Sequence, residues 1–192
     1  NPQGSFFGIL SKCSFFGLLS IILYVLAYTP LKRLSTTSVF IGAIPGAIPF
    51  LLGWVAATDD FELYGGTLFA IQFFWQFPHF IAIAWVLDKE YKKAGFKMLF
   101  GNKKGRYPAV LSIISSLITI IISLVPFFWN HNTLTLSIYA FVLIAILGIW
   151  FTLKSIRLYI NANDFNAKKL MIASIFYLPL LQIIYITDKL LR

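Results

Sequence analysis

Six long apolar runs alternate with short polar segments along the chain. Each run has enough residues to cross a bilayer as a helix, which takes about 20 residues. None shows the strict apolar–polar alternation of a transmembrane β-strand, and each is much longer than such a strand. The pattern predicts an all-α membrane protein, one domain with six transmembrane helices, at about 13–31, 37–57, 66–87, 108–129, 133–153 and 170–187.

Basic residues are distributed unevenly among the five connections between these runs. In chain order, the connections contain 2, 0, 7, 0 and 4 lysine and arginine residues. Cytoplasmic loops of membrane proteins carry the excess of these residues. We therefore expect the first, third and fifth connections (residues 32–36, 88–107 and 154–169) in the cytoplasm, and both Asn1 and Arg192 on the outer side.

The composition supports a membrane protein and argues against several other classes. Of the 192 residues, 59% are hydrophobic and 12% are charged, whereas soluble domains are about a quarter charged. The net charge of +9 lies largely in short loops between apolar runs, so we expect no nucleic-acid binding. The single cysteine, Cys13, allows no internal disulfide, and Rossmann, P-loop and zinc-ligand patterns are absent from the sequence. The chain starts with Asn-Pro and no methionine, and we expect it to be a piece of a longer protein.

The second run is unusual in its glycine and proline content. Gly42 and Gly46 make a small-residue face that lets another helix approach closely. Pro45 and Pro49 each remove a backbone donor and favour a bend. A tightly packed, kinked helix and a cavity wall are both consistent with this pattern.

The third run contains a polar stripe on an otherwise apolar helix. Gln72, Gln76 and His79 stand at i, i+4 and i+7, so they share one helical face. If the helix continues, Glu90 returns to nearly the same azimuth about 16 Å further along the axis, whereas Asp88 points to the opposite face. Ionisable groups at this depth are costly and usually functional. The alternative is a neutral imidazole that is hydrogen-bonded to Gln76 or to a neighbouring helix.

The connection after this run combines two acids with seven bases. Asp88 and Glu90 are carboxylates, the ligands that Mg²⁺ prefers, and Mg²⁺ often bridges to phosphate oxygens. Lysine and arginine bind phosphates directly, and Lys32 and Arg33 face the same side of the membrane. These residues favour a site for a phosphate-bearing substrate with magnesium. A solvated loop whose charges only set the topology has the same composition.

The remaining polar residues point to no particular chemistry. Asp59 and Asp60 lie in an outer connection, away from the basic side. His131 lies in another outer loop and is expected to be solvated. Asp164 is interpreted as part of an ordinary cytoplasmic connection.

Four sequence motifs resemble those of a known enzyme family. In the family's order they are YTPLKR (28–33), GAIPGAIPFLLGWVA (42–56), WQFPHFIAIAW (75–85) and DKEYKKAG (88–95). They make this half of the chain similar to the protohaem IX farnesyltransferases (haem O synthases), which are UbiA-type intramembrane prenyltransferases. The resemblance implies a bundle of nine transmembrane helices around a cavity open to the cytoplasm or matrix. The six runs would be its fourth to ninth helices, the C-terminal two-thirds.

The resemblance also implies roles for individual residues. His79 falls on the histidine of the family's Trp-Gln-x-Pro-His stretch, which marks His79 and Gln76 as catalytic candidates. Lys32 and Arg33 fall on a basic pair that would grip a diphosphate, with Tyr28 beside them.

The metal site that the resemblance implies is incomplete in this chain. Glu90 stands at the second aspartate of the family's Asp-Asp-Tyr, and Lys89 replaces the first. Asp88, one place earlier, is the alternative ligand for Mg²⁺. The family's first acidic motif, Asn-x-x-x-Asp-x-x-x-Asp, has no counterpart in these 192 residues. We therefore expect this chain to hold half a metal site and to be inactive by itself.

The implied reaction transfers a farnesyl group from farnesyl diphosphate to the vinyl group of haem b, giving haem O for terminal oxidases. His79 would hold the haem or assist proton movement. The alternatives are a sister prenyltransferase with an aromatic acceptor such as 4-hydroxybenzoate, and a non-catalytic membrane component or transporter. We expect a multi-pass protein of the bacterial cytoplasmic membrane rather than the mitochondrial inner membrane. Haem-handling and oxidase assembly proteins are candidate partners.

Overall fold

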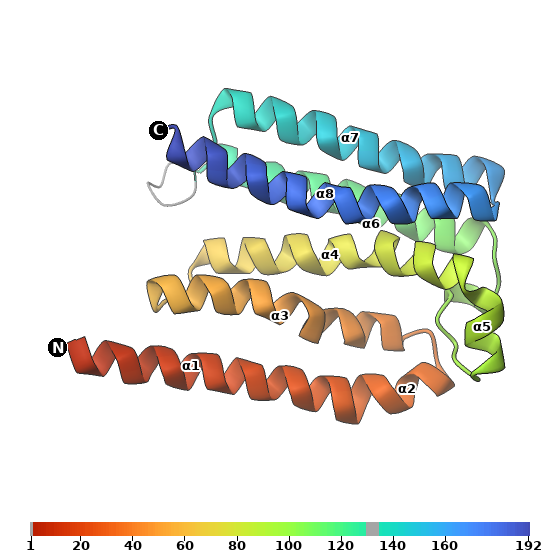
Figure 1. Cartoon of the computed structure of the whole chain (residues 1–192), viewed down its shortest axis with the longest axis horizontal. Coiled ribbons are helices and arrows are strands. Elements are labelled where there is room, and N and C mark those ends of the chain that lie inside the picture. The colour runs from red at the N-terminus through yellow and green to blue at the C-terminus, as the bar shows by residue number, and fades with distance from the viewer. Residues whose placement is uncertain (1, 130–134) are drawn as a thin grey trace.

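The computed structural model describes residues 2–129 and 135–192, and within these ranges it contains helices and connections but no strand. Six helical rods, each long and apolar enough to cross a membrane, lie roughly side by side (Figure 1). The predicted all-α membrane fold is thus confirmed. His131, predicted to be solvated, lies outside the described residues. The elements are α1 (Pro2–Ile22), η1 (Leu23–Tyr28), α2 (Thr29–Leu34), α3 (Ser38–Thr58), α4 (Leu63–Val86), α5 (Asp88–Lys93), η2 (Phe100–Asn102), α6 (Arg106–Leu124), η3 (Val125–Phe127), α7 (Ile138–Asn161) and α8 (Asp164–Leu190).

The helices extend beyond the apolar runs that predicted them, as the connection between α7 and α8 illustrates. The predicted loop of residues 154–169 is wrong, because α7 stays helical through Lys154 and Arg157 and α8 begins at Asp164. Lysine and arginine are good helix formers, so the helix does not end where the apolar run ends. The side chain of Asn163 caps α8 by accepting a hydrogen bond from a backbone N–H in its first turn, at 2.9 Å.

The central helix of the bundle is α4. It contacts α3 on one side and both α6 and α8 on the other, while α7 packs against α6 and α8. The rod formed by α1, η1 and α2 lies at the edge and packs against α3. In the apolar window of α4, 56% of residues are buried, against no more than 33% in any other rod. The helix that carries the predicted polar stripe is therefore the most enclosed one.

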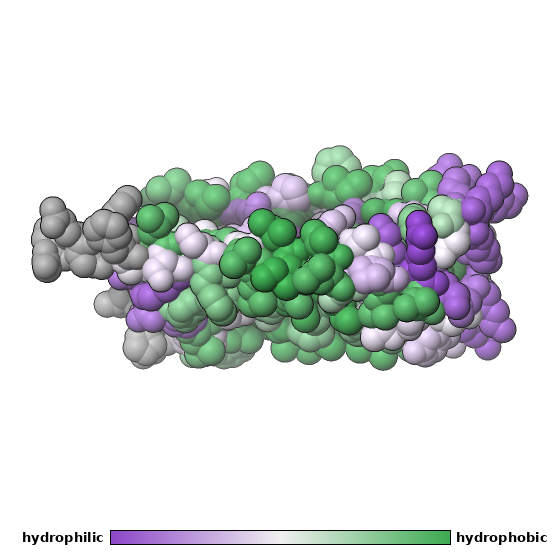
Figure 2. Space-filling model, turned by 90° about the horizontal axis from the view of Figure 1, so that it is seen from below, coloured by the Kyte–Doolittle hydropathy of each residue, from purple (hydrophilic) through white to green (hydrophobic). Residues whose placement is uncertain are grey.

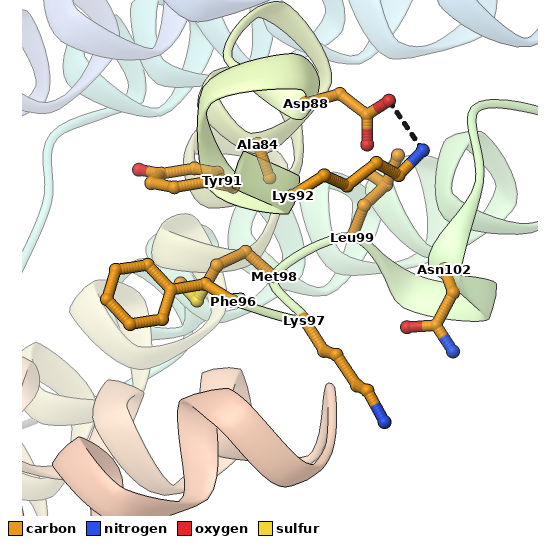
Figure 3. A pocket seen from close by; sticks show the side chains of 9 residues that line it. All are labelled: Ala84, Asp88, Tyr91, Lys92, Phe96, Lys97, Met98, Leu99 and Asn102. Carbon is orange, nitrogen blue, oxygen red and sulfur yellow. Dashed lines mark hydrogen bonds and ion pairs between the residues drawn. The ribbon is translucent and has the colours of Figure 1, made fainter. Parts of the chain in front are cut away.

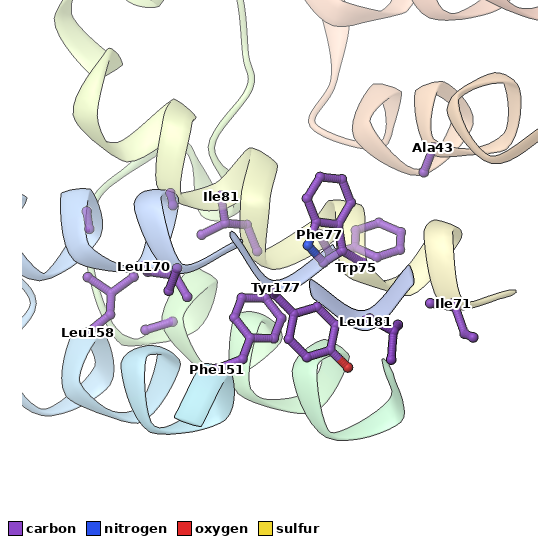
Figure 4. Close-up of a cluster of buried hydrophobic side chains, with 14 of the residues drawn as sticks. Ala43, Ile71, Trp75, Phe77, Ile81, Phe151, Leu158, Leu170, Tyr177 and Leu181 are labelled. Carbon is purple, nitrogen blue, oxygen red and sulfur yellow. The ribbon is translucent and has the colours of Figure 1, made fainter. Parts of the chain in front are cut away.

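Aromatic rings and small hydroxyl side chains fill the space beside α4. Phe151 of α7 stacks on Tyr177 of α8, with ring centroids 4.7 Å apart (Figure 4). Serine and threonine residues of α6 donate to carbonyls of their own helix, as Thr119 does to Ser115 at 2.8 Å. These α6 hydroxyls are satisfied within the helix. Their small side chains therefore allow close packing without leaving a donor unpaired in the membrane.

The second run forms α3, which stays helical through Pro45 and Pro49. The second proline cannot donate to the Pro45 carbonyl, which instead accepts a hydrogen bond from Ser20 of α1 at 3.2 Å. A side chain at Gly46 would collide with the amide of Gln76, so this glycine lets α3 and α4 approach closely. From Pro49 onward, α3 lines a cavity of about 380 Å³.

Most of the basic residues gather at one end of the bundle. Figure 2 shows apolar surface along much of the side in view and hydrophilic surface at the end that carries α5 and the turn between α7 and α8. The first, third and fifth connections all reach this end. The bases that predict the cytoplasmic side therefore lie together around one end of the rods.

Candidate active site

His79 lies in the middle of α4 and is held by α8. Its Nδ1 lies 2.8 Å from the Ser174 hydroxyl oxygen, and that hydroxyl donates its only proton to the Met171 carbonyl at 2.6 Å. Ser174 must therefore accept a hydrogen bond from Nδ1–H. In the neutral imidazole, Nε2 is then the nitrogen with a free lone pair.

The Trp75 indole fixes the plane of this imidazole. The two rings stack with centroids 4.8 Å apart and an interplanar angle of 15°. The indole N–H of Trp75 also donates to the Ser174 carbonyl at 2.9 Å. Ser174 of α8 thus anchors both His79 and the ring that stacks on it, and Nε2 is the imidazole nitrogen that does not contact Ser174.

Gln76 shares the helix of His79 but faces a different neighbour. Its amide nitrogen donates to the carbonyls of Ala43 in α3, at 3.0 Å, and of Gln72, at 3.2 Å. The side chain is buried against α3. Its donors therefore join α4 to α3, and its amide oxygen lies against Gly46 of α3.

The helix does not continue from His79 to the acids, so the predicted alignment of Glu90 with His79 is wrong. The α4 helix ends at Val86, Leu87 leaves the helical conformation, and α5 begins at Asp88. The short α5 has acids in its first turn and lysines in its last, an arrangement that its own dipole favours. The chain therefore starts a separate helix at the membrane surface and does not extend the buried one.

Asp88, rather than Glu90, faces a pocket. Its side chain is 14% exposed and pairs with Lys92 at 2.8 Å, whereas Glu90 is exposed. Figure 3 shows Asp88 at the rim of a cavity of about 260 Å³ between α5 and the segment that follows it. The cavity is lined by Ala84, Asp88, Tyr91, Lys92, Phe96, Lys97, Met98, Leu99 and Asn102.

The segment after α5 is folded onto the bundle, which the sequence pattern did not predict. Leu99 and Phe100 are each 3% exposed. Phe100 packs edge-on against Phe40 of α3 at 5.3 Å, and Phe40 contacts Phe77 of α4 at 4.8 Å. In the sequence, only the two apolar residues within a strongly basic connection indicate that this segment, called the cap below, is buried. The segment therefore has a defined position over the end of α3 and α4.

The basic pair of the first connection meets this segment. The Lys32 ammonium lies 4.7 Å from the centre of the Phe96 ring and 5.7 Å from that of Tyr28. The Arg33 guanidinium carbon lies 5.9 Å from the Phe96 ring centre. The backbone N–H of Lys97 donates to the Lys32 carbonyl at 2.8 Å. Phe96 and both bases line a groove of about 650 Å³, so residues of two connections form one site.

A π-helical segment precedes this basic pair and was not predicted. It spans Leu23–Tyr28, and both the backbone N–H and the hydroxyl of Thr29 bond to the Tyr24 carbonyl. Pro30 lacks the backbone N–H that an α-helix would need next, and this proline is the feature of the sequence that indicates an irregular helix here. Such segments often occur at functional sites. Here it brings the Tyr28 ring against Gly42, where any larger residue would collide with it.

Tyr91, on α5, is a further candidate that residue-by-residue reasoning missed. Its phenol lines the cavity beside Asp88, and burial raises the pKa of Tyr91 above its usual value near 10. It therefore remains a neutral hydrogen-bond donor at physiological pH.

The donor set for a metal consists of two carboxylates. Among the described residues, no group of three or more histidine, cysteine or acidic side chains could hold an ion. Asp88, which lines the pocket, fits the type of Mg²⁺ site in which one carboxylate binds the ion and substrate phosphates complete the shell, whereas Glu90 is exposed. Asp59, at the far end of α3, is paired with Lys12 at 2.9 Å.

Comparison with known proteins places the chain in a family. A model of the UbiA prenyltransferase family matches residues 5–177. The chain belongs to this family. Protoheme IX farnesyltransferase of Flavobacterium psychrophilum is 48% identical over 181 residues, and that of Christiangramia forsetii is 50% identical over 181 residues. Each alignment covers 94% of the chain and 60% of the relative.

A more distant relative is the human mitochondrial protoheme IX farnesyltransferase, 33% identical over 180 residues, which are 90% of the chain and 38% of that protein. No solved structure matches the chain. The chain spans 60% of the length of the two bacterial relatives. UbiA prenyltransferases generally use divalent metal ions, which agrees with the chemistry of the acidic and basic groups at one end of this multi-pass membrane protein.

Proposed function

We propose that the full-length protein transfers a farnesyl group from farnesyl diphosphate to the vinyl group of haem b and so forms haem O. The observation that carries the proposal is the meeting of Lys32 and Arg33 with the segment of Phe96 and Lys97. It collects cations beside the acid-bearing α5, at one end of an apolar bundle. The relatives named protoheme IX farnesyltransferase support haem as the acceptor.

The basic residues would bind the diphosphate. Lys32 and Arg33 supply charge-assisted hydrogen bonds to phosphate oxygens, and Lys97 lies on the adjoining segment. Asp88, with Glu90 as the alternative ligand, would hold Mg²⁺, which, when bound, supplies positive charge to the departing diphosphate. Tyr28 and the buried Phe100 side of the cap would keep the basic pair in position.

The reaction needs an apolar chamber and a proton acceptor. The bond between the farnesyl C1 and the diphosphate oxygen breaks, C1 bonds to a vinyl carbon, and water adds to the other vinyl carbon with release of one proton. The free Nε2 of His79 is the group that would hold the haem edge or take this proton. The stacked Trp75 ring offers an aromatic face to the positive charge that develops on carbon.

The test is a reconstituted reaction. The full-length protein is incubated with haem b, farnesyl diphosphate and Mg²⁺, and the haems are separated by chromatography. Formation of haem O supports the proposal. Prenylation of 4-hydroxybenzoate instead would favour an aromatic acceptor and quinone synthesis, and no product with either acceptor would favour a non-catalytic membrane component.

The membrane in which the protein acts is also part of the proposal. The relatives at 48% and 50% identity are bacterial, which supports the bacterial cytoplasmic membrane over the mitochondrial inner membrane. The basic end would face the cytoplasm. Haem-handling and oxidase assembly proteins would be its partners, since haem O is a cofactor of terminal oxidases.

A further inference from the structure

One carboxylate fastens both ends of the connection between α4 and α6. The indole N–H of Trp85, near the end of α4, donates to Asp164 Oδ1 at 3.1 Å. The ammonium of Lys104, just before α6, donates to the same oxygen at 2.6 Å. Asp164 is the first residue of α8. The connection is therefore tied at its entry and at its exit to one atom of a third helix.

Loss of the hydrogen bond from Trp85 to Asp164 would cost more free energy than loss of the Lys104 ion pair. Trp85 is fully buried, at 0% exposure, and leaving a buried N–H without its acceptor destabilises the folded protein. The ion pair of Lys104 with Asp164 is exposed, with 61% of the acid side chain accessible, so by itself it contributes little to stability. The indole thus fixes the carboxylate, and the carboxylate fixes the lysine.

Between the two ties lie the residues of the proposed diphosphate site. Asp88 and Tyr91 line the pocket, and Lys97 bonds to the Lys32 carbonyl. A shift of the connection would move all three relative to the basic pair. Ligand-positioning contacts of this kind have large effects on binding although they do not touch the ligand.

We propose that Asp164 is a positioning residue, which, through Trp85 and Lys104, holds the connection of residues 87–105 in register with Lys32 to form a binding site for an isoprenyl diphosphate. The proposal rests on the function proposed above. It assigns a role to a residue that the sequence pattern presents as part of an ordinary loop.

The experiment uses trypsin, because the connection of residues 87–105 contains six lysine residues. In the full-length protein in detergent, Asp164→Ala and Trp85→Phe should speed cleavage of the connection severalfold. Trp54→Phe is the matched control, because the buried Trp54 indole N–H has no hydrogen-bond partner among the described residues. Asp164→Asn, which keeps an acceptor oxygen, should lie closer to wild type than Asp164→Ala.

A second readout separates positioning from mere stability. Farnesyl diphosphate with Mg²⁺ should protect the connection of the wild type, and Asp164→Ala should raise the half-protecting concentration roughly tenfold. A purely structural role would speed cleavage and leave that concentration unchanged, which would overturn the proposal, as would equal behaviour of the Trp85 and Trp54 variants.

A third pair of variants tests the proposal even if the Asp164 variants do not fold. Lys104→Met should reproduce both effects in part, and Lys103→Met, which removes the neighbouring tryptic site, should not. Identical behaviour of these two would also overturn the proposal. Protection does not require haem transfer, so a wild type that is protected but forms no haem O would refute the proposed function and leave the positioning role supported.

Discussion

The backbone N–H of Lys97 donates to the carbonyl oxygen of Lys32 across 2.8 Å, and this contact joins two connections that enter the bundle at different helices. Phe96, the residue before, lies under the Lys32 ammonium. The same segment buries Leu99 and Phe100 against α3 and α4. The basic pair, the pocket of Asp88 and the buried helix end therefore belong to one structural unit.

Replacing His79 with alanine should lower haem O formation at least about 100-fold, the scale of general acid–base catalysis, while the protein still inserts. The measurement is haem chromatography after reaction with haem b and farnesyl diphosphate. Ser174→Ala is the matched control, because it removes the acceptor of Nδ1–H but keeps the imidazole. Its haem O formation should fall clearly less than that of the His79 variant. Normal turnover by the alanine variant at position 79 would refute the role of the histidine.

Asp88→Asn should raise the half-saturating Mg²⁺ concentration roughly tenfold, and Glu90→Gln should raise it less, because only Asp88 lines the pocket. Lys92→Met breaks the same ion pair but keeps the carboxylate, and should leave the magnesium requirement near that of wild type. Titration of activity against Mg²⁺ measures all three. If neither acid variant changes the requirement, the acids belong only to a solvated surface.

Lys32→Met should raise the apparent KM for farnesyl diphosphate roughly tenfold or more, since a hydrogen bond to a charged group contributes about 1.5–3 kcal/mol. Methionine keeps much of the apolar stem against Phe96 while it removes the charge. Lys168→Met, an exposed change on α8, is the control. Initial rates at several salt concentrations are the measurement, and an equal KM in both variants would count against a diphosphate contact at position 32.

Gly46→Ala should destabilise the protein by about 1–3 kcal/mol, the usual cost of overpacking. Its Cβ would lie 2.2 Å from the amide oxygen of Gln76, so the hydrogen bond of Gln76 to Ala43 would be displaced. Gly53→Ala, on the same helix, would place a Cβ with no described atom within 4 Å and should stabilise the protein by about 0.5–1 kcal/mol, because alanine favours a helix over glycine. Thermal unfolding in detergent compares the two. Equal stability of the variants would mean that α3 and α4 are not closely packed at Gly46.

The sequence was sufficient for the features that depend on local pattern. The lengths of the apolar runs predicted six membrane helices because a bilayer requires every spanning backbone to satisfy its own hydrogen bonds. The pattern failed at Leu87, where the assumption of one continuous helix put Glu90 in line with His79. It also failed at Asp164, which only the fold brings to Trp85 and Lys104.

By itself, the sequence determined that this chain is a six-helix membrane protein of a prenyltransferase family with most of its bases at one end, because hydropathy, charge and motif are properties of neighbouring residues. Only the tertiary structure decided that Gln76 turns to α3 and His79 to α8, and that Lys32 meets Lys97. Those contacts join residues far apart in the chain, and their geometry depends on how whole helices pack, which no local pattern contains.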